Sequence, residues 1–353
     1  MTRTLWLVIC LALLAGRGAL AAEPVRGLYT ADVPVTDQSG SELARAAAEG
    51  LAQVLVKVSG SVEVLALPPI EQALGDARNR VRQYSYTRVD PSERRGGAAT
   101  GLAARVEFDP AQVRELLAGA GAPIWTATRP VVLVWLVVED ESGRRFASAD
   151  LDQSLITGLI EGFHRRGVPV RFPLLDLADT AALDPDEAWS LPGSLLLAAS
   201  ERYRATEVLA GRVAVLASGE IAGDWAYLSG SGRKDRGVVR SSASEFLGTG
   251  VAMVAEDLAS RFALAPSGAA SEGLTMTVSG VTSYADYAAV LSWLESLEPI
   301  ARAQVTAVAG DKLSLLLSAD ADAAQLAGII ELNPRLRPGG PSTAGGLSYQ
   351  WRN

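Results

Sequence analysis

The fold class is decided by the apolar run Val131-Val132-Leu133-Val134-Trp135-Leu136-Val137-Val138. A strand with one face in solvent alternates apolar and polar residues, whereas a strand covered on both faces is apolar throughout. The run therefore predicts the central strand of a sheet that carries other elements on both of its faces.

The segments that follow this run alternate between helix and strand patterns. Apolar residues recur at helical spacing in residues 150–166, 194–203 and 243–262, and strand patterns occupy residues 168–172, 207–215, 220–228 and 236–242. Strands that alternate with helices form sheets with crossover connections. Residues 130–265 are therefore predicted to form an α/β domain with a mixed sheet, extended by an antiparallel pair at its end.

Residues 22–125 follow a different order and are predicted to form an N-terminal α+β domain. The patterns indicate a strand at 27–35, a helix at 39–58, a short helix from Pro69, strands at 80–89 and 102–108, and a helix from Pro110. Ser39 is a typical helix N-cap and Gly60 a typical stop signal. The predicted order is βααββα.

The last part of the chain begins after residues 266–273, a stretch of small residues that is typical of a linker. Residues 274–338 show the order βαββαβ, which is that of a ferredoxin-like domain, with a hairpin turn at Gly310-Asp311. Residues 339–353 form a tail in which Leu347, Tyr349 and Trp351 alternate, so the tail is predicted to add an edge strand. The chain as a whole is expected to be a multi-domain α+β and α/β protein.

The start of the chain has the pattern of a secretory signal peptide. Arg3 precedes an apolar run from Leu5 to Ala15, and small residues lead up to Ala21. We therefore predict a signal peptide over residues 1–21, with cleavage between Ala21 and Ala22. The run is shorter than the ~20 residues that a membrane helix needs, so no stable membrane span is expected after cleavage.

Composition excludes several kinds of site. The chain has one cysteine, Cys10, which leaves with the signal peptide, and one histidine, His164, so no Cys cluster, multi-His metal site or disulfide framework is possible. After cleavage 30 basic residues face 40 acidic ones, a net charge of −10, which disfavours nucleic acid and anionic lipid as partners. We predict no metal, no cofactor and no catalytic residues.

Several local patterns resemble chemical motifs but have a simpler structural interpretation. His164 stands where a helix is about to end, and Ser231 with Lys234 has S-x-x-K spacing inside a Gly/Ser-rich loop. Gly248-Thr249-Gly250 lies within a helix, where it indicates tight packing. A run of acidic residues lacks the glycine and final glutamate of a calcium loop: Asp176, Asp179, Asp184, Asp186 and Glu187. Within this run, Asp184-Pro185-Asp186-Glu187 is typical of the capped start of a short helix.

One stripe of side chains is a candidate binding site. If residues 78–88 are extended, period-two alternation places Arg78 and Arg80 on one face together with the candidate residues Arg82, Tyr84, Tyr86 and Arg88. Such a face can stack sugar rings on tyrosines and pair acidic groups with arginines. The alternative is a solvated hairpin face in which arginine stems cover the tyrosines, with residues 78–80 still helical.

Four motifs resemble an exported proteobacterial family of unknown function, number 2066 in the series of unknown domains. They are Leu28-Tyr29-Thr30-Ala31-Asp32-Val33-Pro34-Val35, the helix end from Gly50 to Gly60, Pro123-Ile124-Trp125 with Arg129-Pro130 and Val134-Trp135-Leu136, and Pro173-Leu174-Leu175-Asp176-Leu177. The resemblance covers roughly residues 25–265, brings no catalytic residues, and implies a Gram-negative envelope setting, so we expect the periplasm.

Weaker resemblances concern the order of elements only. The first segment is similar to the N-terminal domain of the flagellar assembly protein T, and the second to the α/β sandwich at the N-terminus of TolB and of lipoprotein activators of wall synthases. The last segment resembles sporulation-related wall-binding repeats in topology. Similar folds host unrelated functions, so these resemblances imply architecture rather than activity.

Two functions remain open at this stage. The favoured one is a non-catalytic periplasmic accessory or scaffold protein that binds an envelope protein or cell-wall glycan. The alternative is a hydrolase or transferase that acts on envelope material through paired carboxylates, which need neither His nor Cys. Two carboxyl groups with raised pKa values that face each other in a deep pocket would favour the enzyme.

Overall fold

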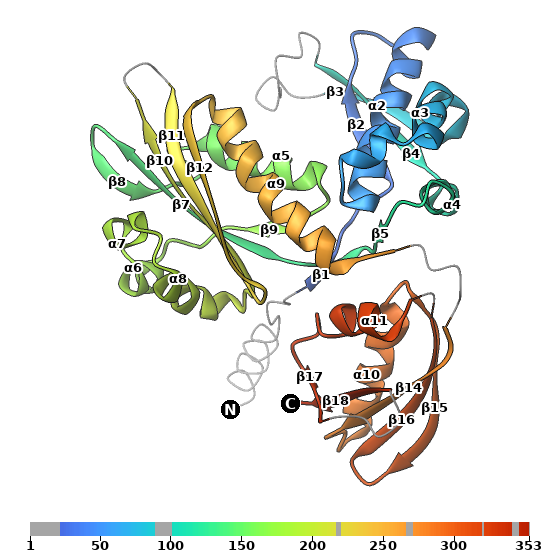
Figure 1. Ribbon diagram of the computed structural model, residues 1–353. Helices are drawn as coiled ribbons and strands as arrows, with labels where there is room; N and C mark the ends of the chain where they lie inside the picture. Colours follow the sequence, from blue (N-terminus) through green and yellow to red (C-terminus); the bar gives the residue numbers. More distant parts are fainter. Residues whose placement is uncertain are drawn as a thin grey trace, which may run out of the picture.

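The computed structural model describes residues 22–88, 101–216, 220–265, 271–319, 321–340 and 346–352. The predicted signal peptide, residues 1–21, lies outside the described residues, as does most of the loop between the first two long strands. The chain is a mixed α and β protein with several separate sheets, and Figure 1 shows three units that follow one another along the sequence.

The first unit has the predicted βααββα order. Its antiparallel sheet has the strand order β2-β4-β3, and its elements are β2 (Thr30–Pro34), α2 (Gly40–Ser59), α3 (Pro68–Gly75), β3 (Val81–Arg88), β4 (Leu102–Phe108) and α4 (Pro110–Gly119). Both predicted signals of α2 are confirmed, because the Ser39 hydroxyl accepts from the Glu42 amide and Gly60 adopts a left-handed φ of 77°. The apolar side of α2 packs with the sheet into one core.

The middle unit is a sheet with helices on both faces. The strand order is β12-β11-β10-β7-β8, with β9 paired to β7. The strands are β7 (Val132–Asp140), β8 (Gly143–Phe146), β9 (Val170–Arg171), β10 (Glu207–Val215), β11 (Ile221–Ser229) and β12 (Gly232–Ser241), and the helices are α5 (Gln153–Arg165), α6 (Leu177–Ala182), α7 (Pro185–Trp189), α8 (Gly193–Ser200) and α9 (Ala243–Phe262).

Strand β7 is covered on both faces, as its uninterrupted apolar sequence predicts. Its residues from Val132 to Val138 are all buried. Val134 and Leu136 face the core under α5 and α9, whereas Leu133 and Trp135 face a second core under α6, α7 and α8. The two helical layers therefore lie on opposite sides of the sheet (Figure 1).

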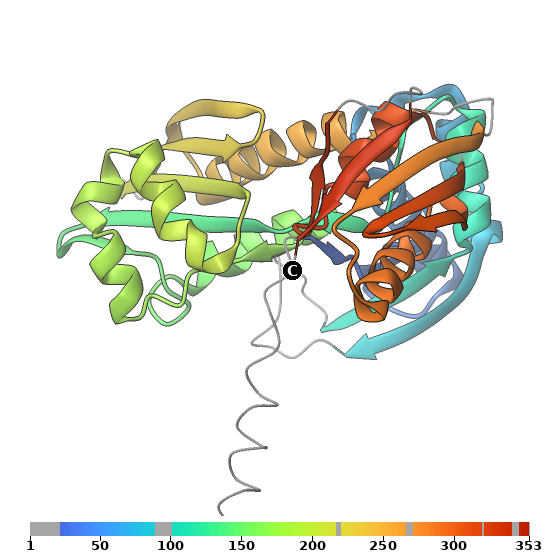
Figure 2. The same cartoon turned by 90° about the horizontal axis from the view of Figure 1, so that it is seen from below.

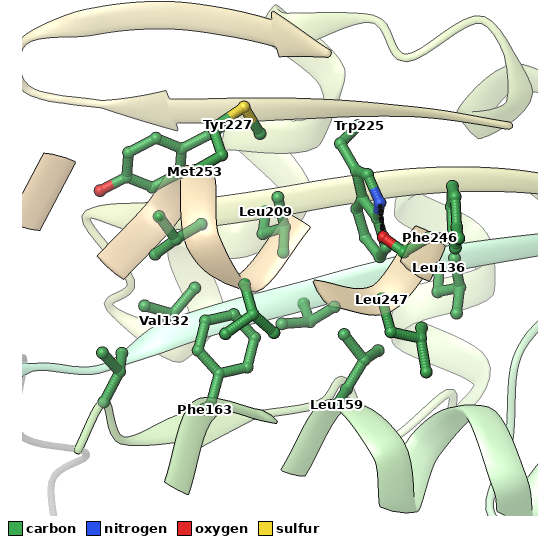
Figure 3. Close-up of a cluster of buried hydrophobic side chains, with 14 of the residues drawn as sticks. Val132, Leu136, Leu159, Phe163, Leu209, Trp225, Tyr227, Phe246, Leu247 and Met253 are labelled. Atoms are coloured by element: carbon green, nitrogen blue, oxygen red, sulfur yellow. Dashed lines mark hydrogen bonds between the residues drawn. The ribbon is translucent and has the colours of Figure 1, made fainter. Parts of the chain in front are cut away.

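The core beneath α9 is built around Trp225. Figure 3 shows Trp225 beside Phe246, whose carbonyl accepts a hydrogen bond from the indole Nε1 at 2.9 Å. A Cβ added to Gly250 would lie 2.7 Å from the indole ring, so a larger residue there would displace the tryptophan. The Gly248-Thr249-Gly250 sequence thus serves close packing, at Gly250, as its position within a helix indicated.

The last unit has the predicted element order but a different sheet. Its strands are β14 (Ser271–Ser279), β15 (Ile300–Ala309), β16 (Lys312–Ala319), β17 (Leu336–Pro338) and β18 (Leu347–Trp351), and its helices are α10 (Tyr284–Ser296) and α11 (Ala323–Ile330). The order is β15-β16-β14-β18-β17. The last three residues of the expected linker, 271–273, already belong to β14.

The tail strand is an interior strand, so the prediction of an edge strand was wrong. Strand β18 pairs parallel with β14 and antiparallel with β17, and it thereby separates two strands that a ferredoxin-like sheet would place side by side. Trp351 is buried, and its Nε1 donates to Asp286 at the start of α10 at 3.0 Å. Burial of Tyr349 and Trp351 holds the tail inside the sheet, because both aromatic rings belong to the core.

Two short antiparallel strand pairs join the ends of the units. Strand β1 (Ala22–Pro24) pairs with β6 (Thr128–Pro130), and β5 (Ile124–Trp125) pairs with β13 (Ala263–Leu264). Ala22 packs against the core of the last unit, and Trp125 belongs to the core of the middle unit. The residues at the predicted domain boundaries therefore contribute to neighbouring units.

The guanidinium of Arg129 is fully buried where the first two units meet. It donates to the carbonyls of Lys57 at 2.7 Å, Trp125 at 2.9 Å, Thr126 at 2.8 Å, Gly167 at 2.9 Å and Arg166 at 3.3 Å, and it stacks on the Trp125 ring. Lys57 lies near the end of α2, and Arg166 and Gly167 directly follow α5. One cation thus caps the carbonyl ends of two helices from different units, where positive charge is favoured.

Lys57 is a second buried cation at this junction and makes stability depend on pH. Its Nζ donates to the carbonyl of Thr30 at 2.9 Å, and burial lowers its pKa to about 8. The ordinary value is about 10.4, so between these values the folded state binds fewer protons than the unfolded state, and stability rises with pH.

We expect the difference in unfolding free energy between the wild type and Lys57→Met to shift by about 3 kcal/mol in favour of the wild type as pH rises from 7 to 10.5. Urea titrations of both proteins at several pH values measure this difference. A difference that stays constant over this range would contradict the assignment.

Candidate functional site

The predicted stripe is only partly realised. Arg78 and Arg80 lie in a short 3₁₀ turn (Ala77–Arg80) before β3, so they do not join the strand face. In β3, Val81 is opposite Phe108 and Gln83 is opposite Glu107, so a β-bulge falls at Arg82. Arg82 contacts Glu107 at 3.7 Å, on the sheet face opposite that of Val106. The bulge therefore separates Arg82 from the tyrosines, because it breaks the period-two alternation.

Tyr84, Tyr86 and Arg88 do share a face. Tyr84 pairs with Val106 and Tyr86 with Ala104, both of which are buried, so the tyrosines lie along the margin of the first unit's core. Their rings meet edge to face at 5.9 Å between centroids, and Tyr84 is half exposed. Strand β3 is an edge strand, so this margin lies at the open side of the sheet.

The remaining sequence motifs have structural roles. His164 is exposed in the last turn of α5, Ser231 lies in the turn between β11 and β12, and Lys234 forms an ion pair with Asp257. Asp176 caps α6, while Asp184 and Glu187 form the capping box of α7. Across the described ranges, no group of three or more His, Cys, Asp and Glu side chains is placed to hold a metal ion.

Two buried carboxylates, Glu207 and Asp257, belong to one ion network. Arg261 donates to Glu207 at 2.8 Å, to Tyr227 at 2.9 Å and to Asp257 at 2.9 Å, and Tyr227 also contacts Glu207. Burial raises the pKa of Glu207. Because Arg261 and Tyr227 occupy the Glu207 carboxylate, this pair of acids does not favour the hydrolase or transferase alternative.

An exposed apolar surface covers the outer side of the middle unit. We call residues 173–206, which run from the end of β9 to the start of β10, the helical cover. Four of its leucines are exposed, and we call them together the leucine face: Leu174 is 72% exposed, Leu177 86%, Leu195 40% and Leu197 45%. Leu195 and Leu197 lie two residues apart in α8, on either side of the buried Leu196. The face continues over exposed alanines of α6 and α8, two helices that pack together.

Helix α8 shows most clearly that this surface lacks a partner. Its sequence, GSLLLAAS, contains no charged residue, and Leu196 points into the core while Leu195 and Leu197 remain exposed. A helix that is apolar all round is normally buried on all sides. Figure 2 shows the helical cover at the end of the molecule remote from the last unit, so no described element covers it.

The loop that carries Leu174 is held rigidly from below. The amide of Leu174 donates to the hydroxyl of Tyr203 at 2.8 Å, and the amide of Leu175 donates to Asp179 at 2.8 Å. Asp179 is fully buried and also accepts from Tyr203 at 2.6 Å and from Arg202 at 2.8 Å. These contacts anchor the backbone of the loop at Leu174 and Leu175.

Backbone strain is concentrated in the same segment. Among the described residues, the non-glycine residues with positive φ are Leu175 at 55°, Leu191 at 52° and Arg204 at 52°, and all three lie in the helical cover. Each such conformation costs on the order of 1 kcal/mol, and strain of this kind clusters at functional sites. Arg204 is the C-cap of a short 3₁₀ helix and Leu191 directly follows the C-cap of α7, and left-handed residues are common where helices end.

The sequence patterns did not identify this site. Leu195-Leu196-Leu197 without a neighbouring charge was the available signal, but periodicity alone cannot tell a buried apolar helix from an exposed one. The capped helix start predicted at Asp184-Pro185-Asp186-Glu187 is confirmed by the capping box of α7. No sequence pattern indicated that Asp179 is the buried acceptor of the Leu175 amide.

Comparisons with known proteins give a match for the first unit alone. In the part of the chain that the structure describes, no helix is both long and apolar enough to cross a membrane. A search of curated proteins gives no match. Residues 22–126 match the model of a family described as a domain of unknown function, DUF8605, which agrees with an uncharacterised N-terminal domain.

Proposed function

We propose that this protein is an exported, non-catalytic accessory protein of the cell envelope that binds a partner protein through its leucine face. The observation that carries the proposal is the exposure of Leu174 and Leu177, at 72% and 86%, on a loop that buried polar contacts hold in place. Exposed apolar patches on rigid supports are typical of protein interaction sites.

The proposal includes the cellular compartment of the protein. The signal-peptide pattern before Ala22 and the resemblance of residues 25–265 to exported family 2066 support a periplasmic location. Three units joined through Arg129 and β1 give a rigid support, which suits a scaffold.

Site-specific photo-crosslinking tests the partner. A photoreactive amino acid at Leu177 or Leu197 is expected to crosslink one reproducible protein in intact cells that export the chain. The control positions are Val239 and Val308, which are 81% and 65% exposed but lie on other surfaces. Equal crosslinking from all four positions, or none from the leucine positions, would contradict the proposal.

Cell-wall glycan is a second candidate partner, because Tyr84 and Tyr86 expose aromatic surface beside Arg88 on the open edge strand. We expect the triple variant Tyr84→Ala/Tyr86→Ala/Arg88→Ala to lose most of its retention on purified cell-wall glycan. Arg82→Ala is the matched control, since the bulge places Arg82 on the other face. Unchanged retention of the triple variant would remove glycan as a ligand of this stripe.

A further inference from the structure

We propose that the leucine face selects a cationic amphipathic segment, namely an apolar stripe flanked by Lys or Arg in the partner protein. This inference rests on the proposed function and adds the chemistry of the partner. It is argued from the charged residues around the leucines, because exposed leucines alone do not indicate which charge a partner carries.

The helical cover is strongly acidic. Residues 173–206 contain six acidic and two basic residues, a net charge of −4 within a chain whose total is −8. Asp184, Asp186, Glu187 and Glu201 are exposed on α7 and at the end of α8. Arg202 pairs with Asp176 and Asp179, and Arg144 of β8 pairs with Asp186 at 3.3 Å. The rest of the negative charge of the cover is carried by Asp184, Glu187 and Glu201.

The same charges argue against two other occupants. In a symmetric pair of chains, the acidic rim of one cover would face the rim of the other, and like charges placed together weaken an interface. A surface of anionic lipids would be repelled in the same way. A segment with an apolar stripe and basic flanks suits this surface, because its stripe can bury the leucines and its basic residues can pair with the surrounding acidic residues.

The paired helices offer a place for a third helix. Helices α6 and α8 pack together, with Leu177 at the start of α6 and Leu195 and Leu197 on α8, so a partner helix can lie along the pair as in ordinary helix packing. The loop contacts to Asp179 and Tyr203 keep Leu174 at the margin of this surface. The partner helix therefore meets a preformed site.

The test uses the whole exported chain and a synthetic amphipathic helix of about 18 residues, made only of leucine and lysine. We expect binding that weakens on the order of ten-fold when salt is raised from 50 to 500 mM. The matched peptide with glutamate in place of lysine is expected to bind at least ten-fold more weakly. Fluorescence anisotropy of labelled peptides measures both.

Variants separate the two contributions. Leu174→Ser/Leu177→Ser/Leu197→Ser is expected to abolish binding of the lysine peptide, while Val239→Ser/Val308→Ser leaves it unchanged. Asp186→Asn/Glu201→Gln removes two exposed charges without touching the capping box of α7. It is expected to weaken binding several-fold and to flatten the salt dependence.

Each of the following results would overturn the inference. Equal affinity for the lysine and glutamate peptides would show that charge does not select the partner, and retained binding by the triple leucine variant would show that the peptide binds elsewhere. Tighter binding to vesicles of phosphatidylglycerol, or leucine-dependent dimerisation, would assign the face to lipid or to a second copy. If crosslinking identifies a partner without basic flanks, the proposed function stands and only this inference fails.

Discussion

Arg129→Ala is expected to lower the free energy of unfolding by about 3–5 kcal/mol. The guanidinium is fully buried and donates to five backbone carbonyls, so its removal leaves these acceptors without partners and opens a cavity beside Trp125. Urea titration followed by tryptophan fluorescence measures the loss. Because Lys57 and Gly167 belong to different units, we also expect the contact between the first two units to loosen.

Arg165→Ala is the matched control, since Arg165 is the last residue of α5 and its side chain is 61% exposed. Its loss is expected to change stability by less than about 0.5 kcal/mol. Arg129→Met keeps most of the volume but none of the donors, so it separates the cavity from the hydrogen bonds. If Arg129→Ala were no more destabilising than Arg165→Ala, the junction would not depend on this cation.

Trp351→Ala is the second large effect, with an expected loss of about 3–5 kcal/mol in the last unit. The ring is 4% exposed, its Nε1 donates to Asp286 at 3.0 Å, and Arg335 lies 4.8 Å above it. Since β18 lies between β14 and β17, loss of its anchor should expose the amides of both neighbours. Hydrogen exchange of β14 and β17, compared with β7 and β10 of the middle unit, measures this.

Trp351→Phe keeps the aromatic core contact and removes the hydrogen bond, so we expect a smaller loss, of roughly 1–2 kcal/mol. An edge strand would behave differently, because its release would leave the β14 pairing intact. Faster amide hydrogen exchange in β18 alone would therefore contradict its position in the interior of the sheet. Faster exchange in β7 and β10 would show that the effect is not limited to the last unit.

The order of elements was predictable because its signals are local. Ser39 and Gly60 set the ends of α2, Pro110 starts α4, and the apolar run after Val131 forms a strand buried on both faces. Caps and periodicity act within one or two turns, so a sequence reports them directly. The predicted stripe failed at Arg82 because a bulge depends on how β3 pairs with β4, and no residue pattern within β3 encodes that pairing.

The sequence by itself determined the order of most helices and strands and the acidic charge of the chain, and it predicts a signal peptide before Ala22. Only the tertiary structure decided that β18 lies inside its sheet, that Arg129 joins two units, and that Leu174, Leu177, Leu195 and Leu197 remain exposed together. The physical reason is that burial and strand pairing depend on contacts between residues far apart in the chain. A leucine has the same local preference whether its helix is covered or free, so its exposure becomes known only when the whole fold is in place.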